Sequence, residues 1–66
     1  MNKFQVFRTN TWGREHVGPW QPSLKAALEF IAAVSGEVID YEEDSSHPLN
    51  YDVFAAPGAV FQIEPV

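Results

Sequence analysis

The chain has 66 residues, a formal net charge of −5, 45% hydrophobic residues and no cysteine. A chain this short forms one domain, residues 1–66, because it buries only about 60% of its unfolded surface. Its hydrophobic content excludes a disordered chain, and the lack of cysteine excludes disulfides and thiolate metal sites. It has neither an apolar run near the roughly 18 residues of a membrane span nor a secretory signal pattern, so we expect a soluble cytosolic protein.

The charges are divided unequally between the two parts of the chain. Residues 1–25 hold all 4 basic side chains and one acid, whereas residues 26–66 hold eight acids and no base. Proteins that bind nucleic acid directly use Lys and Arg to displace counterions from phosphates, so we expect no direct nucleic-acid binding here. The balance favours a basic partner.

The N-terminal segment predicts one strand followed by a long loop. In residues 3–9, the apolar Phe4 and Val6 are two residues apart, with Lys3, Gln5 and Phe7 in the alternate positions. This period of two is typical of a half-buried strand. Residues 10–22 contain two Gly and two Pro and therefore predict a loop. The pattern leaves open whether the strand continues to Trp12.

This loop holds an aromatic group with two interpretations. Trp12, His16 and Trp20, with Arg14 between them, include the residue types that most often anchor protein interfaces. In the second interpretation, which we favour from the sequence, both Trp side chains cover the open end of a small core.

A helix is predicted after the loop. Ser23 is a preferred N-cap residue, and Gly36 is a preferred C-terminal stop. The apolar stripe of this helix consists of Leu24, Ala27, Leu28, Ile31 and Val34.

Residues 37–44 alternate again and predict a strand with an acidic face. Ile39 and Tyr41 are expected on one side of this strand. The other side is expected to hold Val38, Asp40, Glu42 and Asp44. Same-face residues two apart on a strand lie about 6.6 Å apart, so the carboxylates would form a row on the solvent side.

The C-terminal segment predicts a hairpin. Residues 45–50 are rich in turn formers, and residues 51–56 and 59–65 read as two strands joined at Pro57 and Gly58. The resulting order is β-α-β-β-β. We therefore predict an α+β fold, a small antiparallel sheet of about four strands with one helix packed on one face.

Two carboxylates of the hairpin extend the acidic row onto neighbouring strands. Phe61 and Ile63 are expected to point inward, which turns Glu64 outward. Asp52 joins the same face if its neighbours point toward the helix, and Phe54 then lies beside it among the carboxylates. Neighbouring strands are roughly 5 Å apart, so the acids would form a two-dimensional array.

Metal chemistry fits the sequence poorly. Asp40, Glu42 and Asp44 match the alternating ligands of a calcium loop, but Ser45 stands where the sharp turn needs Gly, and Tyr51 where the bidentate Glu belongs. Zinc has no ligand set, because His16 and His47 are 31 residues apart and no Cys joins them.

Catalytic motifs are also missing from the sequence. It has no Gly-rich phosphate loop, nucleophile elbow or Ser/His/Asp spacing, and a one-helix domain offers little depth for a cleft that would raise a carboxyl pKa. We therefore expect neither an enzyme nor a cofactor. Two interpretations of the acidic row remain: a solvated surface, or an imitation of nucleic-acid phosphates that binds a basic protein surface.

In its small size, acidity, mixed strands and helix and lack of cysteines and catalytic motifs, the chain resembles the anti-CRISPR proteins of phages, most of all the type I-C inhibitors. The resemblance implies a monomeric inhibitor in the bacterial host cytoplasm. It would act on a type I CRISPR-Cas surveillance complex (Cascade) as a DNA mimic that blocks binding of target DNA and of the protospacer-adjacent motif. The partner-binding residues would be Asp40, Glu42, Glu43, Asp44, Asp52 and Glu64.

An alternative function uses the other notable stretch of the sequence. The chain would then be a small regulatory interaction module that binds through the loop of Trp12 and Trp20, with acidity serving only solubility. Salt separates the two hypotheses, because charge-driven binding weakens steeply as salt rises and aromatic anchoring does not.

Overall fold

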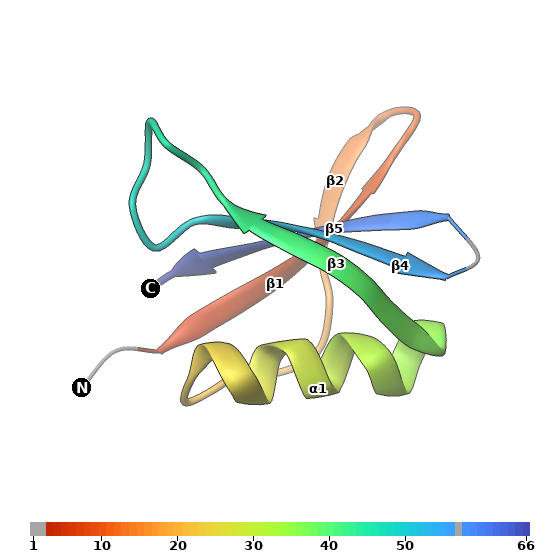
Figure 1. Cartoon of the computed structure of the whole chain (residues 1–66), viewed down its shortest axis with the longest axis horizontal. Helices are drawn as coiled ribbons and strands as arrows, with labels where there is room; N and C mark the ends of the chain where they lie inside the picture. Colours follow the sequence, from red (N-terminus) through yellow and green to blue (C-terminus); the bar gives the residue numbers. More distant parts are fainter. Residues whose placement is uncertain (1–2, 57) are drawn as a thin grey trace.

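The computed structural model describes residues 3–56 and 58–66 and contains one helix and a five-stranded antiparallel sheet in these parts of the chain (Figure 1). The elements in chain order are β1 (Phe4–Asn10), β2 (Gly13–His16), α1 (Leu24–Ser35), β3 (Glu37–Glu43), β4 (Tyr51–Ala56) and β5 (Ala59–Pro65). The predicted α+β fold with one helix is confirmed, with one strand more than the sequence indicates.

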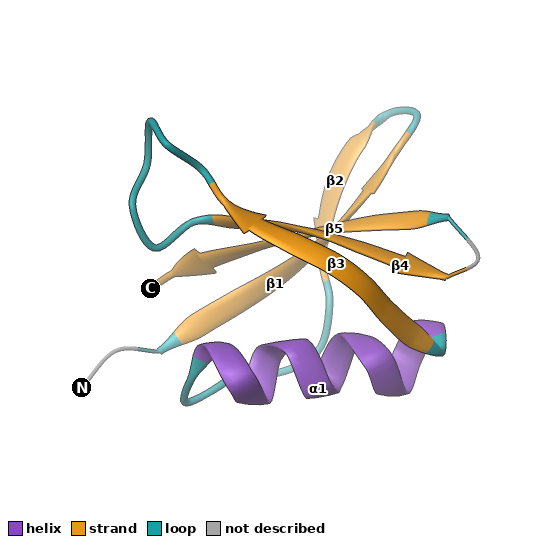
Figure 2. Cartoon of the chain, in the orientation of Figure 1, coloured by secondary structure: helices purple, strands orange, loops and turns teal. Residues whose placement is uncertain are grey.

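The strands lie in the order β2-β1-β5-β4-β3. The N-terminal and C-terminal strands are therefore neighbours inside the sheet, while β2 and β3 form its two edges. Helix α1 connects these two edge strands, so it must cross one face of the sheet, as Figure 2 shows. We call the other face, which α1 does not cover, the outer face.

The core lies between α1 and the sheet. Alternate side chains of a strand point to opposite faces, so each of β1, β4 and β5 supplies two buried side chains to this layer. The buried side chains are Phe4, Val6, Ala27, Ile31, Val53, Ala55, Phe61 and Ile63. Burial of this apolar layer is the main source of stability in so small a domain.

The helix begins and ends where the sequence predicts. The hydroxyl of Ser23 accepts a hydrogen bond from the Ala26 N–H at 3.1 Å. At the other end, Gly36 adopts a φ of 115° and donates its N–H to the Ala32 carbonyl at 2.8 Å. The predicted stripe is wrong at one position, since Val34 at the helix end is 52% exposed rather than packed in the core.

Strand β2 lies within the segment that the sequence predicts as a loop. It pairs with β1 in the register Asn10↔Gly13 to Phe7↔His16, so β1 ends at Asn10 and does not reach Trp12. All four residues of β2 are exposed. A strand without buried side chains has no apolar alternation, which is why the pattern did not reveal it.

The β4–β5 hairpin agrees with the prediction in the part that the structure describes. Gly58 has a φ of 134° and donates its N–H to the Ala55 carbonyl at 2.8 Å. Such a positive φ favours glycine, as the predicted turn requires. The role expected for Pro57 lies outside the described residues.

Candidate protein-binding site

The structure distributes the six predicted carboxylates over three places. Some lie on the outer face, some hold the β3–β4 loop together, and one is bound by an arginine. The six side chains are those of Asp40, Glu42, Glu43, Asp44, Asp52 and Glu64.

Three carboxylates share the outer face near its β3 edge. Val53 is fully buried under α1, so its neighbours along β4, Asp52 and Phe54, point to the outer face. In the β3–β4 register, Asp40 lies opposite Phe54 and Glu42 lies opposite Asp52. Directly opposite residues share a face. We call Asp40, Glu42 and Asp52 the acidic edge.

A β-bulge sets the faces of β3. The register shifts between Val38 and Asp40, so Val38 pairs with the buried Ala55 and packs against the core, whereas Ile39 is 67% exposed. The prediction that Ile39 points inward and Val38 outward was wrong, because the extra residue reverses the alternation before the bulge. After the bulge, Tyr41 lies on the helix side and Asp40 on the outer face, as predicted.

Asp40 also has a local structural role at the sheet edge. Its Oδ1 accepts a hydrogen bond from the Tyr41 N–H at 2.8 Å. Carboxylates on an edge strand oppose pairing with a second acidic strand, which protects the edge from aggregation. The charge of Asp40 remains available to a partner, because an N–H donor does not neutralise it.

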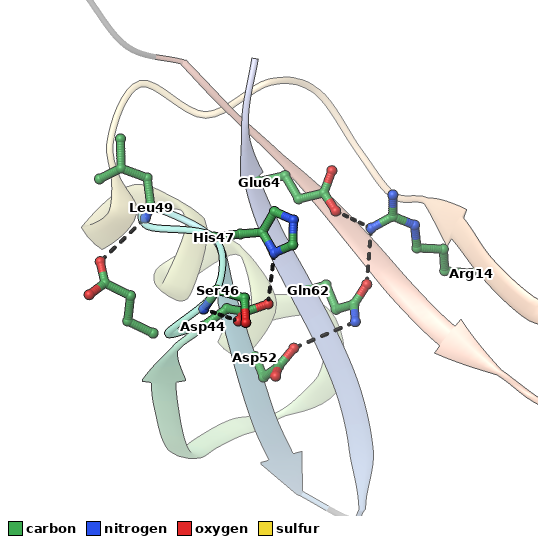
Figure 3. Close-up of polar contacts among 9 residues, drawn as sticks. Arg14, Asp44, Ser46, His47, Leu49, Asp52, Gln62 and Glu64 are labelled. Carbon is green, nitrogen blue, oxygen red and sulfur yellow. Dashed lines mark hydrogen bonds and ion pairs between the residues drawn. The ribbon is translucent and has the colours of Figure 1, made fainter.

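Glu43 lies on the helix side of the sheet, away from the acidic edge. It is opposite Tyr51, which in turn is opposite the buried Ile63. Its Oε2 accepts a hydrogen bond from the Leu49 N–H at 3.3 Å (Figure 3). It also accepts one from the Tyr51 hydroxyl at 3.4 Å. Partial desolvation, followed by the charge and hydrogen bond of Glu43, raises the pKa of Tyr51 above its ordinary value of 10.0. Glu43 therefore stabilises the loop between β3 and β4.

Asp44 follows the end of β3 and organises the loop after it. Its Oδ1 accepts from the Ser46 N–H at 2.8 Å, and its Oδ2 lies 3.6 Å from His47 Nδ1 (Figure 3). The backbone N–H of Asp44 donates to the Asn50 carbonyl at 2.8 Å and closes the loop. Asp44 thus lies one residue beyond the end of β3, and its side chain is engaged by the loop.

Glu64 lies on the outer face but is bound by a base from the distant N-terminal segment. Arg14 on β2 forms an ion pair with Glu64 and donates to Gln62 Oε1 at 3.0 Å, while its guanidinium carbon lies 4.1 Å from the centre of the Phe7 ring. Gln62 in turn donates to Asp52 at 3.5 Å, so one hydrogen-bonded chain crosses the face (Figure 3). The charge of Glu64 is compensated.

The acidic edge has no such compensation in the described parts of the chain. Among these residues Arg14 forms an ion pair with Glu64, and His47, which is charged only when protonated, lies near Asp44; neither contact includes a carboxylate of the acidic edge. Opposed carboxylates with Cβ atoms about 5 Å apart repel by roughly 0.8 kcal/mol in water. Phe54, which is 38% exposed, lies between them on the same face, as predicted.

The two Trp side chains do not cover the core. Trp12, at the turn between β1 and β2, is 95% exposed, and Trp20 is 52% exposed. The favoured prediction that both close the open end of the core is therefore wrong. Lys3 Nζ lies 5.5 Å from the centre of the Trp20 ring. The N-terminal aromatic side chains are consequently available as contact surface.

Two surveys of the described residues bear on the class of site. Across residues 3–56 and 58–66, no group of three or more His, Cys, Asp or Glu side chains is placed to hold a metal ion. Within the same residues, α1 is too short to span a membrane.

No protein-family model, curated protein or solved structure matches this chain.

Proposed function

We propose that this protein is a binding protein whose acidic edge occupies a basic surface of another protein. The observation that supports the proposal is the position of Asp40, Glu42 and Asp52, which lie together on the uncovered face without a compensating base among the described residues. Exposed Phe54 beside them adds apolar contact area, which protein interfaces need at their centre.

The basic surface that we propose is the DNA-binding site of a type I CRISPR-Cas surveillance complex, which the resemblance of the sequence implies. Carboxylates about 6.6 Å apart along a strand and about 5 Å apart across strands make a dense array of negative charge, as the phosphates of duplex DNA do. By this proposal the protein excludes target DNA at the protospacer-adjacent-motif site. Phe54 contributes a contact that DNA phosphates lack.

Charge reversal tests this proposal. Asp40→Lys combined with Glu42→Lys should abolish binding to the purified type I-C surveillance complex with its guide RNA bound, while the fold, followed by circular dichroism, stays intact. Both side chains are exposed, so the fold does not depend on burying them. Unchanged affinity of this double variant for the complex would contradict the proposal.

The matched control changes the same net charge elsewhere. Glu15→Lys combined with Glu29→Lys alters two exposed acids on β2 and α1, away from the acidic edge. This control should bind within about threefold of the wild type, because exposed charges beyond a Debye length of roughly 8 Å are screened at physiological salt.

A second candidate function is favoured by the exposure of Trp12. In this proposal the protein is a small regulatory interaction module that binds through its aromatic hairpin, and its acidity serves solubility. Binding should then persist in high salt and be lost in Trp12→Ala, while the double reversal of Asp40 and Glu42 has little effect.

A further inference from the structure

Strand β3 forms an edge of the sheet and has one open side. In the sheet formed by residues 3–56 and 58–66, it pairs with β4 alone. It starts at the end of α1 and then runs away from the helix (Figure 1). Every residue of β3 after Val38 is exposed, so no described element covers its open side. An edge strand of 7 residues is long enough to accept a further strand through backbone hydrogen bonds.

The ladder between β3 and β4 shows which backbone groups face the open side. Asp44 N–H donates to the Asn50 carbonyl at 2.8 Å and continues the β3–β4 register by one residue. Hydrogen-bonded pairs alternate with non-hydrogen-bonded pairs along an antiparallel ladder, so the backbone groups of Asp40 and Glu42 also point to β4. The residues between them therefore turn their N–H and C=O groups to the open side.

These residues are Tyr41 and Glu43. In agreement with the alternation, the Tyr41 N–H is bound by the Oδ1 of Asp40 at 2.8 Å and not by a carbonyl of β4. The Asp40 carboxylate thus occupies a donor that an added strand needs. A Lys or Arg of the added strand that pairs with this carboxylate draws it away and releases the Tyr41 N–H. The open side of β3 therefore favours a strand that brings a base to Asp40.

The side chains of β3 define the sequence of the strand that fits. Asp40 and Glu42 lie on the outer face, and Tyr41, which is 45% exposed, lies between them on the helix side. Residues of an antiparallel added strand opposite Asp40 and Glu42 belong to non-hydrogen-bonded pairs, in which side chains lie closest. Bases at these two positions, with an apolar residue between them opposite Tyr41, complement the edge in charge and polarity.

The charges of this chain argue against a second copy at this edge. Pairing of β3 with β3 would oppose carboxylates to carboxylates, which is unfavourable. The other edge strand, β2, has 4 residues, and its base Arg14 already pairs with Glu64. The complementary occupant is therefore a segment of a different protein that has free basic side chains.

We propose that a basic extended segment of a partner protein adds to β3 as a further antiparallel strand, with its bases opposite Asp40 and Glu42. The inference rests on the proposed function, because it describes how a basic surface contacts the acidic edge. Backbone hydrogen bonds supply affinity and the side-chain pairs supply selectivity, as in other proteins that bind peptides by strand addition.

Peptide binding to the full chain tests the proposal. The probe is a capped peptide of about nine residues in which Lys alternates with Val, which is long enough to span β3. The Val residues opposite Tyr41 and Glu43 exchange hydrogen bonds with β3, so N-methylation of the Val residues should weaken binding at least tenfold in calorimetric titration. The matched control is N-methylation of the Lys residues, whose N–H groups face away from β3. This peptide has the same charge and should bind within about threefold of the unmodified one.

Amide hydrogen exchange, measured by NMR, reports the same contact from the side of the protein. The unmodified peptide should slow the exchange of the Tyr41 and Glu43 N–H groups at least tenfold and that of the Glu42 N–H, which already points to β4, far less. Asp40→Lys combined with Glu42→Lys should abolish peptide binding.

Three results would overturn strand addition. These are equal affinity of the two N-methylated peptides with unchanged exchange at Tyr41 and Glu43, retained peptide binding in the double reversal of Asp40 and Glu42, and no binding of the unmodified peptide at about 1 mM. Each concerns the mode of contact only. The proposed function has its own test in the binding of the double reversal to the surveillance complex, so the two failures are distinguishable.

Discussion

Gly18 lies so close to the ring of Phe30 that a side chain at this position must displace the ring. It has a φ of 70°, and a Cβ would lie 2.2 Å from the tip of the ring. Gly13→Ala is the matched control, since Gly13 also has a positive φ but has nothing within 4 Å of its Cβ position. Backbone strain should lower the free energy of unfolding by about 1–3 kcal/mol in Gly13→Ala. Gly18→Ala should lose about 1–3 kcal/mol more, measured by urea denaturation, because the half-buried Phe30 must move. Equal losses of unfolding free energy in Gly13→Ala and Gly18→Ala would contradict the close approach of Gly18 to the Phe30 ring.

The ionisation of Tyr51 is coupled to folding through partial desolvation and through Glu43. Because the pKa of Tyr51 is raised above 10.0, the folded chain holds the phenol proton more tightly than the unfolded chain. This contribution to stability is complete below pH 10 and is lost as the pH rises through the folded pKa. Tyr41→Phe leaves Tyr51 as the one tyrosine, and titration of its absorbance should give a pKa above 10.0. A value at or below 10.0 would contradict the structure.

Strand β2 affects the outer face through Arg14. Arg14→Gln releases Glu64 from its ion pair, so the free energy of unfolding should fall by no more than about 1 kcal/mol, as for other exposed pairs. Affinity for a basic partner should rise about threefold, because Glu64 then adds an uncompensated charge to the face that holds the acidic edge.

The control for this prediction is Arg8→Gln. It makes the same change in net charge, but Arg8 lies opposite Phe61 on the helix side of the sheet. Calorimetric titration of the same partner should give nearly wild-type affinity for Arg8→Gln. Weaker binding of Arg14→Gln would contradict this prediction, because it would mean that Arg14 itself contacts the partner.

The elements differ in how far their sequences reveal them. Local signals in Ser23 and Gly36 were sufficient for α1, and alternation was sufficient for the β4–β5 hairpin. By contrast, β2 has no buried residue, and the bulge at Ile39 inserts a residue that alternation cannot detect. The pair of Arg14 with Glu64 is 50 residues apart in sequence, so it follows only from the strand order.

At the scale of the whole molecule, few buried side chains support the fold. A 66-residue domain has a free energy of unfolding of about 3–10 kcal/mol. Ile31 is fully buried between α1 and the sheet. Ile31→Ala should cost about 2–5 kcal/mol and unfold a large part of the population, whereas Ile31→Val should cost about 0.5–1.5 kcal/mol. Thermal unfolding followed by circular dichroism measures both, and similar losses would contradict the central place of Ile31 in the core.

The charge distribution of the whole molecule depends on how the chain folds. Residues 26–66 contain no base, yet the sheet brings Arg14 to Glu64, whereas the acidic edge has no base beside it among the described residues. Of the six carboxylates, Glu43 and Asp44 bind the β3–β4 loop and Glu64 binds Arg14, which leaves Asp40, Glu42 and Asp52 as the candidates for partner binding. We propose that these three carboxylates together bind a basic surface.

The most direct measurement is capture of the purified type I-C surveillance complex by this protein, with and without saturating target DNA. We expect the wild type to capture the complex and saturating target DNA to abolish this capture, because both ligands need the same basic surface. Capture that survives saturating DNA, or no capture at all, would contradict it.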